Sequence, residues 1–264
     1  KETLVKKILS KLPANSVPCS TGEYSNTNNI NNNISRTRAM VKIQEGCNQV
    51  CAYCIVPKVR GREISIDPKT IISQIEELIN NGYKEIVLTG TQLGTYGFDI
   101  PGIDLAGLIK LILNTTDLPR LRISSLQPQE LSNEILNLWK DPRLCPHFHI
   151  PLQSGSNQIL MLMRRKYSHE LFIEKINQIY STIPHVSITT DVIVGFPGET
   201  DEDFNQTYTL CEKAGFASMH VFPYSSRPGT SASHFSNKIV DTIKTKRSHK
   251  LLQLSRLLLN SSRE

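Results

Sequence analysis

The stretch Gly46-Cys47-Asn48-Gln49-Val50-Cys51-Ala52-Tyr53-Cys54 decides how the rest of the sequence is interpreted. It carries three cysteines spaced C-x3-C-x2-C, just after the apolar alternation Met40-Val41-Lys42-Ile43. A structural zinc site is closed by four ligands, and most iron–sulfur clusters take four cysteines. Three cysteines would therefore leave one iron of a 4Fe–4S cluster open to another ligand. Buried free thiols, or a zinc site completed by a distant His or Cys, are the alternatives. The open cluster is favoured because no His lies close by and Tyr53 separates the last two cysteines.

The same motif, with its aromatic residue at Tyr53, resembles the signature of radical S-adenosylmethionine (SAM) enzymes. The flanking segments Gln44-Glu45-Gly46-Cys47 and Ile55-Val56-Pro57-Lys58-Val59-Arg60-Gly61-Arg62 are similar to those of the methylthiotransferases. The resemblance extends over most of residues 36–230. It implies that Cys47, Cys51 and Cys54 bind a 4Fe–4S cluster, that SAM binds its open iron, and that Tyr53 lies beside the cofactor.

Composition and charge narrow the setting. A chain of 264 residues can bury a full core. No run approaches the ~18 apolar residues of a membrane span, and no signal peptide opens the sequence. Three of the six cysteines lie in one loop, and this spacing is typical of a metal site rather than of a disulfide framework. It therefore indicates a reducing compartment, and we expect the cytoplasm. The net charge of +6 suits a polyanionic partner, although charge alone is weak support for RNA binding.

Three regions are predicted. Residues 1–38 read as a short helix followed by an Asn/Ser-rich linker, which cannot bury enough apolar area to order itself and contains a lone thiol, Cys19. Residues 39–230 form the core. Residues 231–264 form a C-terminal segment with an amphipathic helix near 237–259.

Strands and helices alternate through the core. Strands are predicted at 39–44, 85–90, 120–125, 147–151, 187–194 and 218–223. Helices are predicted near 68–81, 104–114, 128–139, 156–163 with 168–182, and 200–214. Six β–α repeats imply parallel strands with right-handed crossovers. The fold class is therefore α/β, with an open, partial (β/α)6 TIM-like barrel as the architecture that radical SAM enzymes share, and a flat doubly wound sheet as the alternative.

Polar and glycine-rich segments follow the predicted strands, where parallel α/β folds place their sites. The resemblance implies that Gly90 and Thr91 meet the amino group of the methionine moiety of SAM. A glycine-rich loop without a ligand is the alternative there.

Further SAM contacts are expected from Ser125, Gln153 and Asp191, and Arg164 or Arg165 could pair with a carboxylate, with Arg164 named as the candidate. His147 and His149 share one face of their strand and are interpreted as satisfied barrel residues rather than as bases.

The resemblance implies a transferase that uses a 5′-deoxyadenosyl radical to add a methylthio group to C2 of N6-threonylcarbamoyladenosine beside the tRNA anticodon. The choice of this target nucleoside rests on two segments that resemble those of the corresponding enzymes, Arg122-Ile123-Ser124-Ser125-Leu126-Gln127-Pro128 and Leu152-Gln153-Ser154-Gly155-Ser156. tRNA and an electron donor are the expected partners. Another radical SAM reaction with a single cluster, or a non-catalytic iron–sulfur or zinc RNA-binding module, are the alternatives.

The sequence departs from the family pattern in one respect. Family members carry three further cysteines for a second 4Fe–4S cluster and a small RNA-binding β-barrel. Cys19, Cys145 and Cys211 are too scattered to replace that trio. We therefore expect an incomplete core that cleaves SAM but does not insert sulfur by itself.

Overall fold

The computed structural model describes residues 38–261 of the chain. The helix and linker predicted before Arg38, together with Cys19, lie outside the described residues.

Six parallel strands form the framework. They are β1 (Ala39–Lys42), β4 (Glu85–Thr89), β5 (Arg120–Ile123), β6 (His147–His149), β7 (Ser187–Val194) and β8 (Ser218–Pro223). The strand orders are β1-β4-β5 and β6-β7-β8, and single parallel bridges, Leu121 with Leu144 and Ser125 with His149, connect β5 to the β6 region. The spatial order follows the chain order, whereas a doubly wound sheet reverses it. The predicted open barrel is confirmed.

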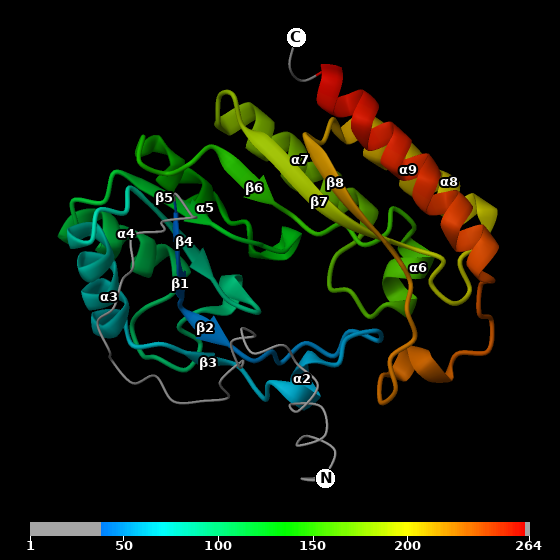
Figure 1. The fold of residues 1–264 in the computed structure, drawn as a ribbon, viewed down its shortest axis with the longest axis horizontal. Coiled ribbons are helices and arrows are strands. Elements are labelled where there is room, and N and C mark those ends of the chain that lie inside the picture. Colours follow the sequence, from blue (N-terminus) through cyan, green and yellow to red (C-terminus); the bar gives the residue numbers. More distant parts are fainter. Residues whose placement is uncertain (1–37, 262–264) are drawn as a thin grey trace, which may run out of the picture. The chain divides into compact units, whose positions relative to one another are not determined.

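Helices lie along the outside of this strand arc (Figure 1). Those that follow the barrel strands are α3 (Pro68–Asn80), α4 (Leu105–Thr115), α5 (Asn133–Asn137), α6 (Asn157–Leu162), α7 (His169–Thr182), α8 (Asp201–Ala214) and α9 (Asp241–Ser261). Their starts are chemically fixed: the Asp67 side chain accepts from the Thr70 amide at 3.2 Å, and Thr200 forms a reciprocal capping box with Asp203. Gly215, with φ +63°, ends α8.

Strand limits differ from the prediction where the chain turns toward the mouth of the barrel. The predicted strand 39–44 stops at Lys42, and Gln44–Glu45 (β2) pairs antiparallel with Ile64–Ser65 (β3). This small ribbon holds the two ends of the cysteine loop, residues 46–55, and the following short helix α2 (Val56–Val59) together. β7 and β8 have the predicted limits. Burial alternates along the whole of β7, whereas the last two residues of β8, Phe222 and Pro223, are both exposed.

The single helix predicted over 128–139 is wrong. The segment divides into a 3₁₀ turn, η2 (Pro128–Glu130), the helix α5, and a second 3₁₀ turn, η3 (Leu138–Lys140). Ser132 causes the break, because its hydroxyl accepts from the Ile135 amide at 3.1 Å and so begins a new helix. The C-terminal helix starts at Asp241 rather than at residue 237.

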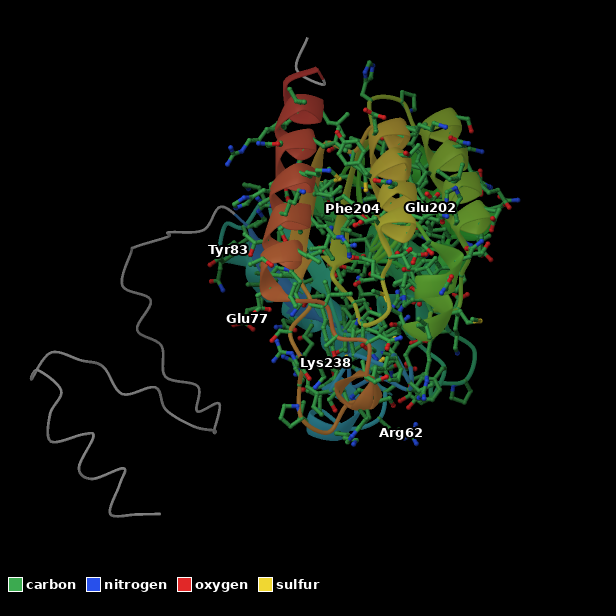
Figure 2. All side chains as sticks on the ribbon, turned by 90° about the vertical axis from the view of Figure 1, so that its right-hand side faces the viewer. Arg62, Glu77, Tyr83, Glu202, Phe204 and Lys238 are labelled. Carbon is green, nitrogen blue, oxygen red and sulfur yellow. The ribbon has the colours of Figure 1, made fainter. Side chains whose placement is uncertain are left out.

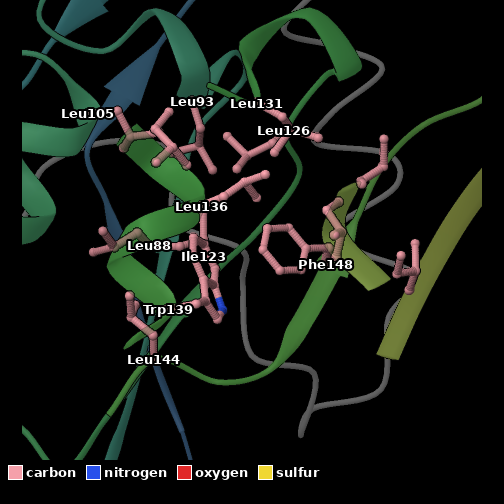
Figure 3. Close-up of a cluster of buried hydrophobic side chains, with 14 of the residues drawn as sticks. Leu88, Leu93, Leu105, Ile123, Leu126, Leu131, Leu136, Trp139, Leu144 and Phe148 are labelled. Carbon is pink, nitrogen blue, oxygen red and sulfur yellow. The ribbon is translucent and has the colours of Figure 1, made fainter. Parts of the chain in front are cut away.

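A hydrophobic core fills the space between the strands and the outer helices. Figure 3 shows part of it, where Ile123 and Phe148 from the strands meet Leu136 and Trp139. The Trp139 and Phe148 rings have centroids 4.3 Å apart, and the Trp139 indole donates to the Cys145 carbonyl at 2.8 Å. This packing fixes the strands, so the loops after them have a rigid base.

The C-terminal helix α9 is part of the same core. Its Leu251 and Leu254 are buried, and α9 packs along β8 and α8 (Figure 2). Arg247 of α9 lies 5.5 Å from the Phe204 ring and pairs with the buried carboxylate of Glu199, which follows β7. The loop between β7 and α8 is thereby attached to α9.

Candidate functional site

The cysteine loop is held by backbone hydrogen bonds at several points. The Cys47 amide donates to the Gly61 carbonyl at 3.2 Å, and the Ala52 amide donates to the Met163 carbonyl at 3.0 Å. Gly46 has φ +74°, and a Cβ on it would lie 1.9 Å from the Arg62 carbonyl oxygen, so only glycine fits there. Ala52 anchors the loop in a second, smaller apolar cluster. The buried members of this cluster are Ala52, Ile159, Met163, Phe196, Tyr224 and Ala232.

Within residues 38–261, the three sulfurs do not all lie within 4.8 Å of one another. Among residues 38–261, only the group His149, Asp191 and His220 brings three Cys, His, Asp or Glu ligand atoms within 4.8 Å of one another. Sulfurs bound to a single zinc ion at ~2.3 Å would lie only ~3.8 Å apart. A 4Fe–4S cluster attaches each cysteine to a different iron and suits a wider spacing. The donor set therefore fits a cluster better than zinc, and all three cysteines are free thiols.

Burial raises the pKa of Cys47 to about 11. This thiol keeps its proton at neutral pH unless a metal displaces it.

Arg165 is the arginine that contacts the cysteine loop. Its Nη1 donates to Cys51 Sγ at 3.3 Å and to the Tyr53 hydroxyl at 3.4 Å, and its Nε donates to the Tyr167 hydroxyl at 3.1 Å. Burial opposes its charge, but Tyr167, Tyr53 and Cys51 raise its pKa, so it stays a cation.

The neighbouring Arg164 is exposed and adopts φ +58° just after α6. That left-handed residue ends the helix and turns Arg165 inward. Arg164 was named as the candidate from the sequence, but the arginine that contacts the cysteine loop is Arg165.

A buried polar network connects Arg165 to the loop after β4. Arg165 Nη2 donates to Gln127 Oε1 at 3.0 Å, and Gln127 Nε2 donates to Gln92 Oε1 at 2.5 Å. Gln92 also donates to Glu130, whose pKa is raised by burial. Gln92 and Glu130 could not be singled out from the sequence, because each lies among other polar residues, in Thr89-Gly90-Thr91-Gln92 and Gln127-Pro128-Gln129-Glu130.

Gly90 and Thr91 lie against the start of the cysteine loop. Gln44 Oε1 accepts from the Thr91 amide at 3.0 Å, and Gln44 Nε2 donates to the Gly46 carbonyl at 3.0 Å. A Cβ on Gly90 would lie 3.1 Å from the Gln44 carbonyl oxygen, so the backbones approach closely here.

A cavity of about 400 Å³ opens beside the cysteine loop. Tyr53, Gln153 and Asp191 line it together with Ile193 and the segment 222–225 and Arg227. Gln153 has φ +62° and continues the pairing to β7, because its amide donates to the Asp191 carbonyl at 2.8 Å. Three predicted residues thus share one cavity, while Gly90 and Thr91 lie next to the loop but do not line it.

Two predicted residues are engaged with histidines. Ser125 forms its parallel bridge with His149. Asp191 lies between His149 Nε2 and His220 Nδ1, each 3.1 Å from a carboxylate oxygen. Burial opposes ionisation of Asp191, but these hydrogen bonds lower its pKa below the usual value.

Three thiols on a loop at the carboxyl end of an open parallel barrel, next to a cavity of ligand size, define the class of protein. The family profile described as the Radical SAM superfamily matches residues 41–211, and the chain belongs to this superfamily.

Among curated proteins, the chain is 44% identical over 222 residues to the threonylcarbamoyladenosine tRNA methylthiotransferase MtaB of Bacillus subtilis. The matched region covers 83% of this chain and 49% of that protein. It is also 44% identical over 221 residues to the tRNA-2-methylthio-N(6)-dimethylallyladenosine synthase of Clostridium perfringens, with coverage of 83% and 49%. The chain spans about half the length of the curated relatives it matches.

Solved structures agree on the fold. The radical SAM methyltransferase TsrM from Kitasatospora setae superposes with a TM-score of 0.61 at 15% identity, covering 74% of this chain and 38% of that one. Coproporphyrinogen III oxidase (HemN) from Escherichia coli gives a TM-score of 0.57 at 16% identity, covering 85% and 52%. Within residues 38–261, no helix combines the length and apolar character needed to cross a bilayer.

Proposed function

We propose that this chain is the radical SAM core of a tRNA methylthiotransferase that acts at C2 of N6-threonylcarbamoyladenosine beside the anticodon. The observation that carries the proposal is the arrangement of three free thiols on one loop beside a charged Arg165 and a cavity of about 400 Å³. The similarity to tRNA methylthiotransferases adds the class of substrate.

Cys47, Cys51 and Cys54 would hold the 4Fe–4S cluster. With SAM bound, that cluster would supply a 5′-deoxyadenosyl radical, which is the cofactor's own chemistry. The chain's part is to place the cofactors and exclude water. Arg165 Nη1 holds Cys51 and Tyr53 together, and the buried cluster around Ala52 and Phe196 keeps the loop from moving away from the barrel.

Tyr53, Gln153 and Asp191 would line the SAM site, because they share the cavity next to the cysteines. Its remaining wall is largely apolar and aromatic, with Ile193 and Tyr224, as a nucleoside requires. Arg165 suits the carboxylate of SAM, since a guanidinium binds a carboxylate through two parallel hydrogen bonds. Gly90 and Thr91 remain candidates for the amino group, and Ser125, which follows β5, for a polar contact.

Exposed cations surround this site. Lys58, Arg60 and Arg62 follow the cysteine loop and are exposed, and Arg227 lines the cavity. Lys58 Nζ donates to the Gly229 carbonyl at 2.5 Å, which brings the segments of these cations together. Side chains of this kind contact phosphates and give salt-dependent RNA binding.

The first test is anaerobic reconstitution of the full chain with iron and sulfide, followed by addition of SAM and dithionite as the electron donor. We expect four irons per chain and release of 5′-deoxyadenosine. If zinc binds in place of iron, or if a cluster forms but SAM is not cleaved, the proposal that the chain is a radical SAM enzyme would be wrong. A non-catalytic binding module would then be the better interpretation.

The second test separates the target nucleosides. A strain that lacks the complete gene should lose the methylthio derivative of N6-threonylcarbamoyladenosine from its tRNA nucleosides, measured by mass spectrometry. Loss of the methylthio derivative of N6-dimethylallyladenosine would support the other branch. Loss of neither would point to a different radical SAM reaction.

A further inference from the structure

His149, Asp191 and His220 converge inside the barrel from three adjacent strands. In β7, Thr190 and Val192 are buried against the outer helices, so Asp191 between them faces the interior. Asp191 pairs in register with His220 of β8, and His149 of β6 pairs with Thr189. Strand pairing therefore brings together three side chains at positions 149, 191 and 220, which are separated by 42 and 29 positions in the sequence.

The spacing of their ligand atoms suits one ion. His149 Nε2 lies 3.1 Å from Asp191 Oδ2, and His220 Nδ1 lies 3.1 Å from Asp191 Oδ1. Two atoms bound to one ion at ~2.1 Å, with an angle of ~90–110° between them, are ~3.0–3.4 Å apart. Both contacts fall in that range, and all three atoms lie within 4.8 Å of one another. Only the two imidazoles need to approach each other, and the His220 side chain is 63% exposed and free to turn.

The surroundings already orient the ligands. Thr189 Oγ1 lies 3.0 Å from His149 Nδ1, so the other ring nitrogen, Nε2, is the one presented to Asp191. Metal-binding histidines are oriented in this way by a partner on their second nitrogen. Asp191 supplies the one negative charge of the group, and its hydrogen bonds to the histidines hold its pKa below the ordinary value, which keeps it ionised.

We propose that His149, Asp191 and His220 bind one divalent transition-metal ion, separately from the three cysteines. Two imidazoles and one carboxylate suit zinc, cobalt or iron(II) rather than magnesium or calcium, which prefer oxygen ligands alone. Three protein ligands leave further coordination positions open. Because Asp191 also lines the cavity beside the cysteine loop, such a position faces that cavity and takes water or an oxygen atom of a bound ligand. This inference stands whether or not the chain transfers methylthio groups.

The test uses Co²⁺ as the probe. In the full chain, Cys47, Cys51 and Cys54 are replaced by Ser to remove thiolate binding, and circular dichroism and thermal unfolding check that the variant folds. We expect one equivalent of Co²⁺ to bind, with a visible absorption spectrum that Zn²⁺ abolishes, and X-ray absorption should show imidazole ligands without sulfur. Asp191→Asn and His220→Asn should each weaken binding by ~10–100-fold or more.

His147→Asn is the matched control. His147 lies on the same face of β6 and its Nε2 is 3.4 Å from the same Thr189 hydroxyl, but it does not contact Asp191. Its replacement should leave Co²⁺ binding unchanged. In a second experiment, the chain with its three cysteines intact is reconstituted with the cluster and incubated with Zn²⁺, and unbound metal is removed. We expect one zinc ion per chain to remain bound, and none in the His220→Asn variant.

Absence of stoichiometric Co²⁺ binding would overturn the proposal and leave the three side chains as a hydrogen-bonded group without an ion. Equal affinity in the Asp191→Asn and parent proteins would overturn it as well, because binding would then occur elsewhere.

Discussion

Replacement of Gly46 by Ala should disable the cysteine loop, and Gly61 offers a matched control. The two glycines have nearly the same left-handed backbone, with φ +74° and +75°. This conformation costs a non-glycine residue about 1–2 kcal/mol, so both substitutions carry a similar backbone penalty. Only Gly46 also lacks space: a Cβ there would lie 1.9 Å from the Arg62 carbonyl oxygen, whereas nothing lies within 4 Å of one at Gly61.

The clash at Gly46 can be relieved only by moving the backbone of residues 61–62 away from the loop. That movement breaks the 3.2 Å hydrogen bond from the Cys47 amide to the Gly61 carbonyl, worth about 1 kcal/mol. We expect Gly61→Ala to lower the free energy of unfolding by about 1–2 kcal/mol. Gly46→Ala should lower it by about 2–3 kcal/mol and displace Cys47, so that the cluster no longer forms.

Urea unfolding of the cluster-free chain measures the first effect, and iron and sulfide content after anaerobic reconstitution measures the second. Gly61→Ala should retain the iron content of the parent chain. If Gly46→Ala also retains it and is no less stable than Gly61→Ala, then the close approach of Gly46 to Arg62 does not shape the loop, and the reasoning is refuted.

The other predictions concern the cluster, the arginines and the α9 contact. Cys51→Ala should abolish both the cluster absorbance and the release of 5′-deoxyadenosine. If this variant releases as much 5′-deoxyadenosine as the parent chain, Cys51 is not a cluster ligand. Arg165→Gln should weaken SAM binding by ~10-fold or more, through loss of a charge-assisted contact, whereas Arg164→Gln should leave it unchanged in equilibrium dialysis. Burial raises the pKa of Glu199 to about 7 from 4.5, so the folded chain holds a proton that the unfolded chain releases. Stability should therefore fall by about 2 kcal/mol between pH 5 and pH 7, and Glu199→Gln should remove that dependence in urea unfolding; an unaltered slope would mean that other groups cause it. At pH 8, where Glu199 is ionised, Arg247→Met should cost about 3–5 kcal/mol because it leaves that carboxylate buried without its partner; a loss below 1 kcal/mol there would contradict this.

Local patterns explain which elements could be predicted. β7 was predicted with its observed limits, and its burial alternates over the whole strand. β8 was also predicted with its observed limits, although its burial alternates only in its first half. The helix predicted over 128–139 failed because a single hydroxyl, Ser132, begins a new helix within a sequence of continuous apolar periodicity. Competition of this kind between a side-chain cap and the helix backbone is decided by a few tenths to about 2 kcal/mol and leaves little trace in composition.

The site shows a similar division. The cysteine spacing is local and was read from the sequence, and Tyr53, Gln153 and Asp191 were expected near it. The choice between Arg164 and Arg165 depends on one left-handed residue, which no spacing rule specifies. The approach of Asp191 to two histidines depends on strand register, which is a property of the assembled sheet.

The hydrogen bonds that leave the cysteine loop at Cys51 return to it at Gly46. They run from Arg165 through Gln127 and Gln92 to Gln44, and both ends of the path belong to the same loop. A closed path of this kind is redundant, since breaking one connection still leaves every member attached from the other side. A single substitution among its three glutamines should still cost about 1–3 kcal/mol, because it leaves a buried donor or acceptor unpaired, and the effects of two substitutions should not be additive.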